Sequence, residues 1–346
     1  MERTEIQDLG EFGLIDRMTK GFTTYHKSTE KGVGDDAAII QQHDQVMVTS
    51  TDMLVEGVHF DLSYVPLKHL GYKAMSVNFS DIAAMNALPY QVLVNVAISN
   101  RFSVEAMEEL YEGIKLACND YKVDLIGGDT TSSRSGLVIS VTVMGQAKRK
   151  QLAYRNGAQK GDIICVTGDL GAAYLGLQLL EREKQVFLSN PEMQPKLEGF
   201  DYLLQRQLKP QARTDIVHEL AEAKVQPTSM IDISDGLASE LFHICTQSNI
   251  GCMIYEEKLP IDDATYQVAG DFKMPIATVA LNGGEDYELL FTIKQEDYEK
   301  IEDIAEISPI GYVREASDGL VLHTRAGQNL PIQAQGWVHF KPDQKD

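Results

Sequence analysis

The feature that most constrains this chain is the alternation of strand and helix patterns along its 346 residues. Alternating or β-branched runs at 45–51, 91–99 and 137–144 predict strands. Apolar residues at three- and four-residue spacing predict helices at 66–87 and 103–118. The same succession resumes in the second half of the chain. Such alternation predicts an α/β or α+β fold in which helices pack against sheets.

A basic, glycine-containing stretch at 148–161 (KRKQLAYRNGAQKG) separates two halves of similar pattern. Domains average roughly 150 residues, so the length also favours two of them. We therefore expect one domain at 1–147 and a second at 148–346. Further strands are predicted at 123–126, 162–167, 230–234 and 287–293, and further helices at 171–183, 213–223, 235–247 and 296–305.

The charge balance narrows the range of partners. The chain has 51 Asp and Glu against 31 Lys and Arg, a formal net charge of −20. Such acidity excludes the basic footprint that nucleic acid requires, and it disfavours anionic membranes. Polar residues and a proline interrupt the uncharged stretch at 82–100, so we expect no membrane span there.

The cysteines and the N-terminus point to the cytoplasm. The four cysteines form no C-x-x-C pair, which favours reduced thiols in a reducing compartment. The first residues, MERTEIQDLGEFG, are acidic and lack an apolar segment, so we expect no secretory signal.

Familiar nucleotide-binding motifs are missing. The sequence has no G-x-x-x-x-G-K-[ST] loop, no H-R-D or D-F-G set and no H-E-x-x-H. The stretch Gly32-Val33-Gly34-Asp35-Asp36-Ala37 imitates a dinucleotide loop. A polar segment precedes it, however, and two carboxylates stand where a pyrophosphate would lie, so we reject that interpretation.

One local form recurs in five segments: an aspartate at the end of an apolar strand or beside glycine, with small or hydroxyl neighbours. These aspartates are Asp35 and Asp36, Asp52, Asp129, and Asp232 with Asp235, and to them we add Asp81, which follows Ser80 within the helix predicted at 66–87. Carboxylate and hydroxyl oxygens suit magnesium or calcium, and clustered carboxylates repel one another unless a cation binds between them. For each aspartate alone, a turn or helix N-cap role is the competing explanation, and Asp235 fits an N-cap while Asp35 fits a turn.

At these segments the sequence resembles the thiamine-monophosphate kinase family. The resemblance runs in family order over nearly the whole chain, through GEFGLI (10–15), GDDA (34–37), STDMLVEGVHF (50–60), KAMSVNFSD (73–81), GGDTT (127–131), DISDGL (232–237), GGEDYELLFT (283–292) and GW (336–337). Asn86 stands where the family pattern has glycine.

The resemblance implies the fold shared with aminoimidazole ribonucleotide synthetase. Two α/β domains are expected, with the N-terminal domains pairing into a homodimer and ATP held near the domain cleft. The implied reaction is the magnesium-dependent transfer of the ATP γ-phosphate to thiamine monophosphate. Its product, thiamine diphosphate, completes the biosynthetic route.

The resemblance also implies site residues. Metal ligands would be Asp36, Ser50, Thr51, Asp52, Asp81, Asp129, Asp232 and Asp235. ATP contacts would be Tyr111, Gly128, Asp129, Arg155 and Ser234, and contacts to thiamine monophosphate would be His59, Glu285 and Trp337. The acceptor is a phosphate oxygen already ionised near neutral pH, so no catalytic base is expected and several Mg²⁺ ions would neutralise the charge.

Each of the three residues implied to contact thiamine monophosphate also has a possible structural role. Trp337, the only tryptophan, suits core packing as well as a platform for the thiazolium ring. A lone histidine such as His59 is more often packed, and Glu285 with Asp286 suits a turn. Two alternatives to the kinase stay open: another ATP-dependent synthetase of the same fold, and a non-catalytic nucleotide-binding relative. The segments around His59, Glu285 and Trp337 favour the kinase.

Overall fold

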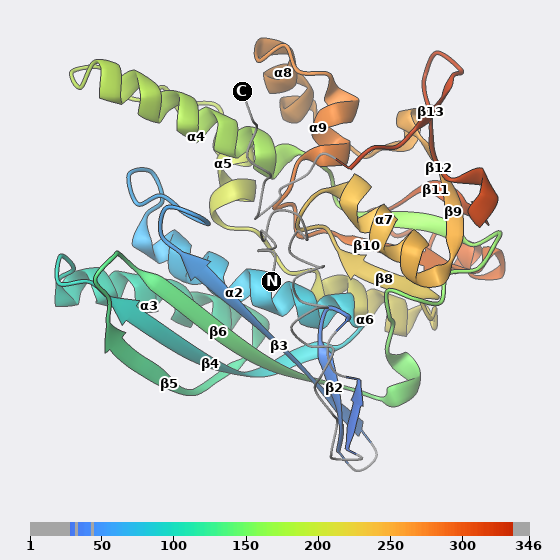
Figure 1. The fold of residues 1–346 in the computed structure, drawn as a ribbon, viewed down its shortest axis with the longest axis horizontal. Coiled ribbons are helices and arrows are strands. Elements are labelled where there is room, and N and C mark those ends of the chain that lie inside the picture. Colours follow the sequence, from blue (N-terminus) through green and yellow to red (C-terminus); the bar gives the residue numbers. More distant parts are fainter. Residues whose placement is uncertain (1–27, 32–33, 43–44, 335–346) are drawn as a thin grey trace, which may run out of the picture.

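The computed structural model describes residues 28–31, 34–42 and 45–334. They form two sheets flanked by helices, as Figure 1 shows. The first sheet has six strands, in the order β1 (Thr29–Lys31), β2 (Ala38–Gln42), β3 (Gln45–Val55), β6 (Val138–Ala147), β4 (Leu88–Ile98) and β5 (Asp124–Ser132). All neighbours in it pair antiparallel except β4 and β5, which are parallel.

Two long helices accompany this sheet, α2 (Leu67–Ala84) and α3 (Val104–Tyr121). They pack closely because glycines stand where they cross. A Cβ on Gly71 would lie 2.0 Å from the carbonyl oxygen of Leu110, and one on Gly113 would lie 1.9 Å from that of Lys68. Helix α3 is capped by the Ser103 side chain, which accepts from the Ala106 backbone N–H.

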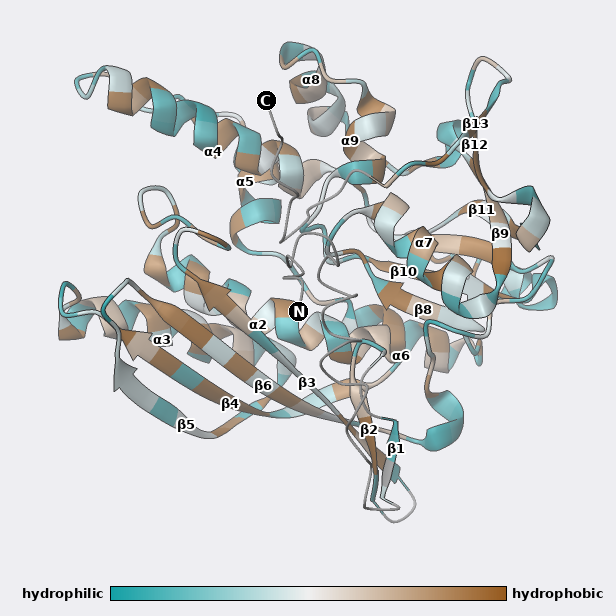
Figure 2. Ribbon diagram, in the orientation of Figure 1, coloured by the Kyte–Doolittle hydropathy of each residue, from teal (hydrophilic) through white to brown (hydrophobic). Residues whose placement is uncertain are grey.

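The second sheet has seven strands, in the order β13 (Asn329–Pro331), β12 (Leu320–His323), β9 (Ile250–Tyr255), β11 (Ile307–Glu315), β7 (Ile163–Thr167), β10 (Leu289–Ile293) and β8 (Ser229–Asp232). The helices of this half are α4 (Ala172–Ser189), α5 (Asp201–Leu208), α6 (Thr214–Glu222), α7 (Leu237–Ser248), α8 (Asp263–Asp271) and α9 (Ile276–Asn282). In Figure 2 brown, apolar segments run along the central strands of both sheets.

Helix α2 belongs to both halves of the molecule. Most of its buried side chains pack in the core of the first sheet, but Ala83 and Ala84 pack with Ile216 and Leu220 of α6 beside the second sheet. Ser76 Oγ of α2 also donates to the carbonyl of Pro210, at 2.7 Å. The two sheets are therefore joined through one buried helix.

Several elements differ from the sequence prediction. Strand β5 continues through the glycines expected to end it, because it pairs with β4 as far as Ser132. A Cβ on Gly128 would lie 1.8 Å from the Val94 carbonyl oxygen, so only glycine fits at this approach. The helix predicted at 296–305 is wrong: only a 3-10 turn, Gln295–Lys300, forms there. Elements α5, α8, α9 and β9 have short apolar patterns and were not predicted.

The backbone conformation at Asn86 accounts for an asparagine where the family pattern has glycine. Asn86 follows α2 with a φ of 53°, in the left-handed region that glycine enters readily. Asparagine is among the few other residues that adopt this conformation at low cost. The substitution therefore preserves the turn between α2 and β4.

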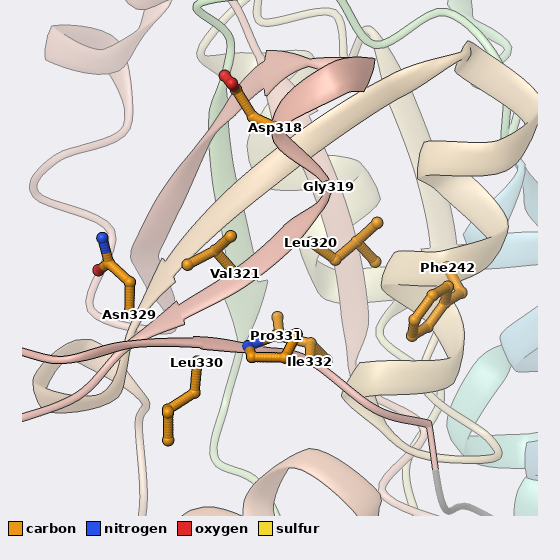
Figure 3. A pocket seen from close by; sticks show the side chains of 9 residues that line it. All are labelled: Phe242, Asp318, Gly319, Leu320, Val321, Asn329, Leu330, Pro331 and Ile332. Atoms are coloured by element: carbon orange, nitrogen blue, oxygen red, sulfur yellow. The ribbon is translucent and has the colours of Figure 1, made fainter.

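A pocket of about 410 Å³ opens at the edge of the second sheet, beside β12 and β13. Figure 3 shows its lining, which is mostly apolar and includes Phe242, Leu320 and Ile332. None of the aspartates singled out in the sequence lines it. In the part of the chain that the structure describes, no helix is long and apolar enough to cross a membrane.

Candidate functional site

Three carboxylates from distant parts of the chain converge where the two halves meet. Asp36 precedes β2, Asp81 lies on α2 and Asp232 ends β8. One carboxylate oxygen of each residue lies within 4.8 Å of those of the other two. The Asp36 and Asp232 residues are only 8% and 4% exposed. We call Asp36, Asp81 and Asp232 the acidic triad.

Serine hydroxyls hold two members of the triad in place. Ser50 Oγ on β3 donates to Asp81 Oδ2, and Ser80 Oγ on α2 donates to Asp232 Oδ2, both at 2.6 Å. The second bond crosses between the two halves. Alternate residues of β3 share a face, so Asp52 lies on the same side as Ser50. The Asp52 backbone N–H donates to Asn78 Oδ1 of α2, at 3.2 Å.

Burial and mutual repulsion make the triad costly to keep ionised. Burial raises the pKa of Asp81 well above its usual value, and the charges of Asp52 and Asp232 raise it further. Burial, followed by the charge of Asp36, raises the pKa of Asp232 to about 7. A divalent cation would relieve this repulsion, and carboxylates with a neighbouring hydroxyl are the hard oxygen donors that magnesium prefers. The residues present thus fit a magnesium site.

Arg155 lies against the triad. Its Nε and Nη2 donate to the two carboxylate oxygens of Asp36, at 2.8 and 2.7 Å, in the bidentate geometry that suits a guanidinium. Asp35 accepts from the Asp36 backbone N–H, at 3.1 Å, and pairs with Lys31. Asp35 therefore acts as a loop residue, in keeping with its turn interpretation.

Two glycine-rich loops lie side by side at the carboxyl end of β8. The backbone N–H of Glu285 donates to the Ser234 carbonyl at 2.7 Å, and that of Tyr287 donates to the Ile233 carbonyl at 2.9 Å. Glu285 has a φ of 67°, which a residue with a side chain adopts only under constraint. The predicted ATP contact Ser234 and the predicted substrate contact Glu285 are therefore neighbours.

The N-cap explanation for Asp235 is wrong. Helix α7 begins after Gly236, and no side chain caps it. Instead, the Asp235 backbone N–H donates to Glu240 Oε1, at 3.2 Å. Glu240 is 3% exposed, and the sequence analysis missed it. Its position on the apolar face of α7, between Leu237 and Leu241, was a usable signal.

Glu285 is held by two side chains from different halves. Lys73 Nζ of α2 lies 2.9 Å from Glu285 Oε1, and Gln207 Nε2 of α5 donates to Glu285 Oε2 at 2.7 Å. Lys73 is buried and also donates to the Gln207 carbonyl, at 3.0 Å. Neither Lys73 nor Gln207 was predicted as a site residue. The signal was a lysine within an otherwise buried helix.

His59 lies in the loop between β3 and α2. Its Nδ1 accepts from the Val55 backbone N–H, at 3.0 Å, so the neutral ring carries its proton on Nε2. Thr51 points away from the triad: its Oγ1 donates to the Val141 carbonyl at 2.9 Å, on the opposite face of β3 from Ser50. The Thr51 side chain is thus not brought to Asp81.

Other predicted residues lie elsewhere in this chain. Gly128 and Asp129 are on β5, and Asp129 is in register with Asn95 of β4. Three strand spacings, about 14 Å, separate β5 from β3. Tyr111 is on the exposed surface of α3. Trp337 lies outside the described residues. The roles given to these four residues stay predictions.

Comparisons with known proteins place this geometry in a family. Residues 34–147 match the AIR synthase related protein, N-terminal domain, and residues 159–321 match the corresponding C-terminal domain. Thiamine-monophosphate kinase of Bacillus subtilis is 35% identical over 339 residues, covering 96% of this chain and 100% of that protein. The enzyme of the same name from Aquifex aeolicus is 34% identical, covering 97% and 99%.

Solved structures support the same family assignment. One described as AaThiL complexed with AMPPCP and TMP superposes with a TM-score of 0.83 at 34% identity, covering 98% of this chain and 100% of that one. Thiamine-monophosphate kinase from Stenotrophomonas maltophilia gives a TM-score of 0.71 at 32% identity, covering 93% and 98%. The expected two-domain fold is confirmed, and the chain is an enzyme that belongs to the thiamine-monophosphate kinase family of AIR synthase related proteins.

Proposed function

We propose that this enzyme transfers the γ-phosphate of ATP to thiamine monophosphate, giving thiamine diphosphate. The acidic triad carries the proposal, because two buried carboxylates and a half-buried one, with Arg155 bound to Asp36, form a site for cation-bridged phosphates. The relatives' names, and a related structure described as holding AMPPCP and TMP, support the choice of substrates.

Magnesium would be held by the triad together with Asp52, with Ser50 and Asp235 as further predicted ligands. The ligand roles predicted for Thr51 and Asp129 would need a metal position other than the triad, because the Thr51 side chain points away from it and Asp129 lies on β5. Bound magnesium supplies the positive charge that lets an acidic site hold phosphates and that offsets charge developing in transfer. Ser50 donates to Asp81 and Ser80 donates to Asp232, so these hydrogen bonds orient the carboxylate oxygens independently of the metal's charge. This support pre-organises the site.

The chain's own residues would then position the two substrates. Arg155 is a buried cation close enough to the triad to contact a phosphate of ATP. The Nε2 proton of His59 suits the phosphate of thiamine monophosphate, and the Glu285 carboxylate suits its cationic ring system. The acceptor oxygen is already ionised, so these residues orient it in line rather than deprotonate it. We expect transfer in one step, and isolation of a phosphorylated chain that passes its phosphate to the acceptor would contradict this.

We also propose a homodimer formed through the N-terminal halves, with the domain division at 147/148. The first sheet supports this, because every residue of β5 is exposed, including Leu125 and Ile126. Met53 on β3 is also 56% exposed. We place the enzyme in the cytoplasm, where the four unbridged cysteines would stay reduced.

The test is an assay for thiamine diphosphate made from ATP and thiamine monophosphate with Mg²⁺. Asp52→Asn and Asp232→Asn keep side-chain shape but remove charge, and each is expected to lower kcat by about a thousandfold or more. Asp263→Asn, at an exposed acid in the first turn of α8, is the matched control and should leave kcat unchanged. Turnover of ATP only with a different acceptor, or no turnover at all, would contradict the proposal.

A further inference from the structure

Helix α4 of the second half contacts the loop that carries His59 in the first half. Tyr64 Oη donates to Glu181 Oε1, and Lys184 Nζ donates to Asp61 Oδ2, both at 2.6 Å. Figure 1 shows α4 reaching from the second sheet toward the loop between β3 and α2. We call this loop, residues 56–66, the His59 loop.

The four side chains form one network rather than two separate bonds. Lys184 Nζ also lies 3.6 Å from Glu181 Oε2 and 5.6 Å from the centre of the Tyr64 ring. The hydrogen bond from Lys184 lowers the pKa of Asp61 to about 2, so the carboxylate is ionised at neutral pH. Lys184 is thus a cation shared by two carboxylates and an aromatic face.

The base of the His59 loop is fixed by contacts within the first half. The Glu56 carboxylate pairs with Arg101 and accepts from the Leu137 backbone N–H, at 2.9 Å. The Gly57 N–H donates to the Phe60 carbonyl, at 2.8 Å, and so closes a tight turn around His59. Beyond this turn, the network with α4 ties the rest of the loop to the second half.

The other end of α4 rests on the loop that carries Glu285. The Asp286 carboxylate accepts from the backbone N–H groups of Gly171 and Ala173, at 2.8 and 3.4 Å, where α4 begins. From there to Lys184 a helix rises roughly 20 Å. One rigid helix therefore joins the segments that carry His59 and Glu285.

We infer that α4 positions the His59 loop for the acceptor substrate, with Lys184 as the positioning residue and Tyr64 and Asp61 as its partners on the loop. The inference rests on the proposed function, in which His59 and Glu285 both face thiamine monophosphate. Helix α4 sets the spacing between them. In this proposal Lys184 acts through the His59 loop and not through contact with the substrate.

Kinetics of three variants test the inference. Lys184→Glu places a carboxylate against Asp61 and Glu181 and should raise the KM for thiamine monophosphate by roughly tenfold, with the KM for ATP changed less than twofold. Lys184→Arg keeps the cation and should retain the wild-type KM. Lys115→Glu, the same charge change on the exposed side of α3, is the control and should leave both constants unchanged. Equal increases in both KM values, or failure of Lys184→Arg to restore binding, would overturn the inference.

Hydrogen exchange separates this inference from the proposed function. Peptides spanning residues 56–66 should exchange faster in Lys184→Glu than in wild type or Lys184→Arg, without any substrate. Unchanged exchange there would overturn the positioning role even in an active enzyme. Absence of thiamine diphosphate formation by wild type, together with faster exchange in the variant, would overturn the proposed function and leave the contact between helix and loop established.

Discussion

Lys73 Nζ lies 2.9 Å from Glu285 Oε1 and joins a buried position on α2 to a strained residue of the second half. The ammonium holds one carboxylate oxygen, while Gln207 holds the other. Neither partner comes from the loop that contains Glu285. The orientation of a predicted substrate residue is therefore set from elsewhere in the fold.

Replacing Lys73 tests this orientation. Lys73→Met removes the charge but keeps an unbranched side chain, leaving Glu285 Oε1 without its ammonium partner. We expect the KM for thiamine monophosphate to rise about tenfold, equivalent to 1.4 kcal/mol, with little change for ATP. Steady-state kinetics with each substrate varied in turn measures both. The control is Lys68→Met on the same helix, where the exposed lysine forms a surface pair with Glu112. Parallel effects of the two substitutions would argue against a specific role.

Removing one charge from the triad should have opposite effects on stability and activity. In Asp81→Asn the side-chain oxygen still accepts from Ser50, but one of three mutually repelling groups is neutral. We expect a higher melting temperature than wild type in EDTA, by about 1–2 °C for each kcal/mol of repulsion relieved in a chain of this length. The rise in melting temperature that Mg²⁺ gives wild type should be smaller, and activity should be lost. Calorimetry with and without Mg²⁺ measures this, and a lower melting temperature in EDTA would contradict the repulsion argument.

His243 on α7 predicts a pH dependence of stability. Burial, with the charge of Arg155 beside it, lowers its pKa to about 4, so the folded state keeps this ring neutral where an unfolded chain would protonate it. The unfolded state binds more protons between about pH 6.5 and 4, so this contribution to stability is present above that window and is lost as pH falls through it.

The matched variant is His243→Gln, which cannot titrate. We expect the free energy of unfolding of wild type to fall by about 2 kcal/mol more than that of the variant between pH 7 and pH 4, after allowance for partial solvent exposure. Denaturant titrations at each pH measure the difference. Identical pH profiles would show that His243 does not contribute.

The exposed β5 strand predicts the dimer surface. Ile126→Asp places a charge on an apolar residue that is 56% exposed, so a paired state should be lost while the monomer stays folded. Sedimentation should give a dimer for wild type and a monomer for the variant, with unchanged circular dichroism. Val104→Asp adds the same charge at the first turn of α3 and should leave the dimer intact. A monomeric wild type would refute the proposed pairing.

Much of the fold was predictable from local pattern. The α2 and α3 helices and the β3, β4 and β6 strands have long, regular apolar periodicities, and the structure confirms them. Short elements such as α9 and β9 depend on tertiary packing, and their seven and six residues carry too little pattern to detect. The 3-10 turn at Gln295–Lys300 shows the converse, because the local pattern predicts a helix at 296–305 that the fold does not form.

The candidate site, like the fold, could be predicted from the sequence only in part. Asp36 and Asp232 are visible in the sequence because a glycine or a strand end marks each of them, whereas Asp81, within α2, is marked only by its hydroxyl neighbour Ser80. The distances between them are not visible, since Asp36 and Asp232 meet only after the two sheets assemble around α2. Partners such as Lys73 and Glu240 are harder still to predict, because their roles arise from tertiary contacts and not from any motif.

Helix α2 places its first turns in one core and its last residues, Ala83 and Ala84, in another. Neither sheet can lose its packing without exposing part of this shared helix. The two halves should therefore not melt separately, and the chain should unfold in one cooperative transition whose calorimetric and van't Hoff enthalpies agree. A protein with two domains in its architecture would then behave as a single unit in its thermodynamics.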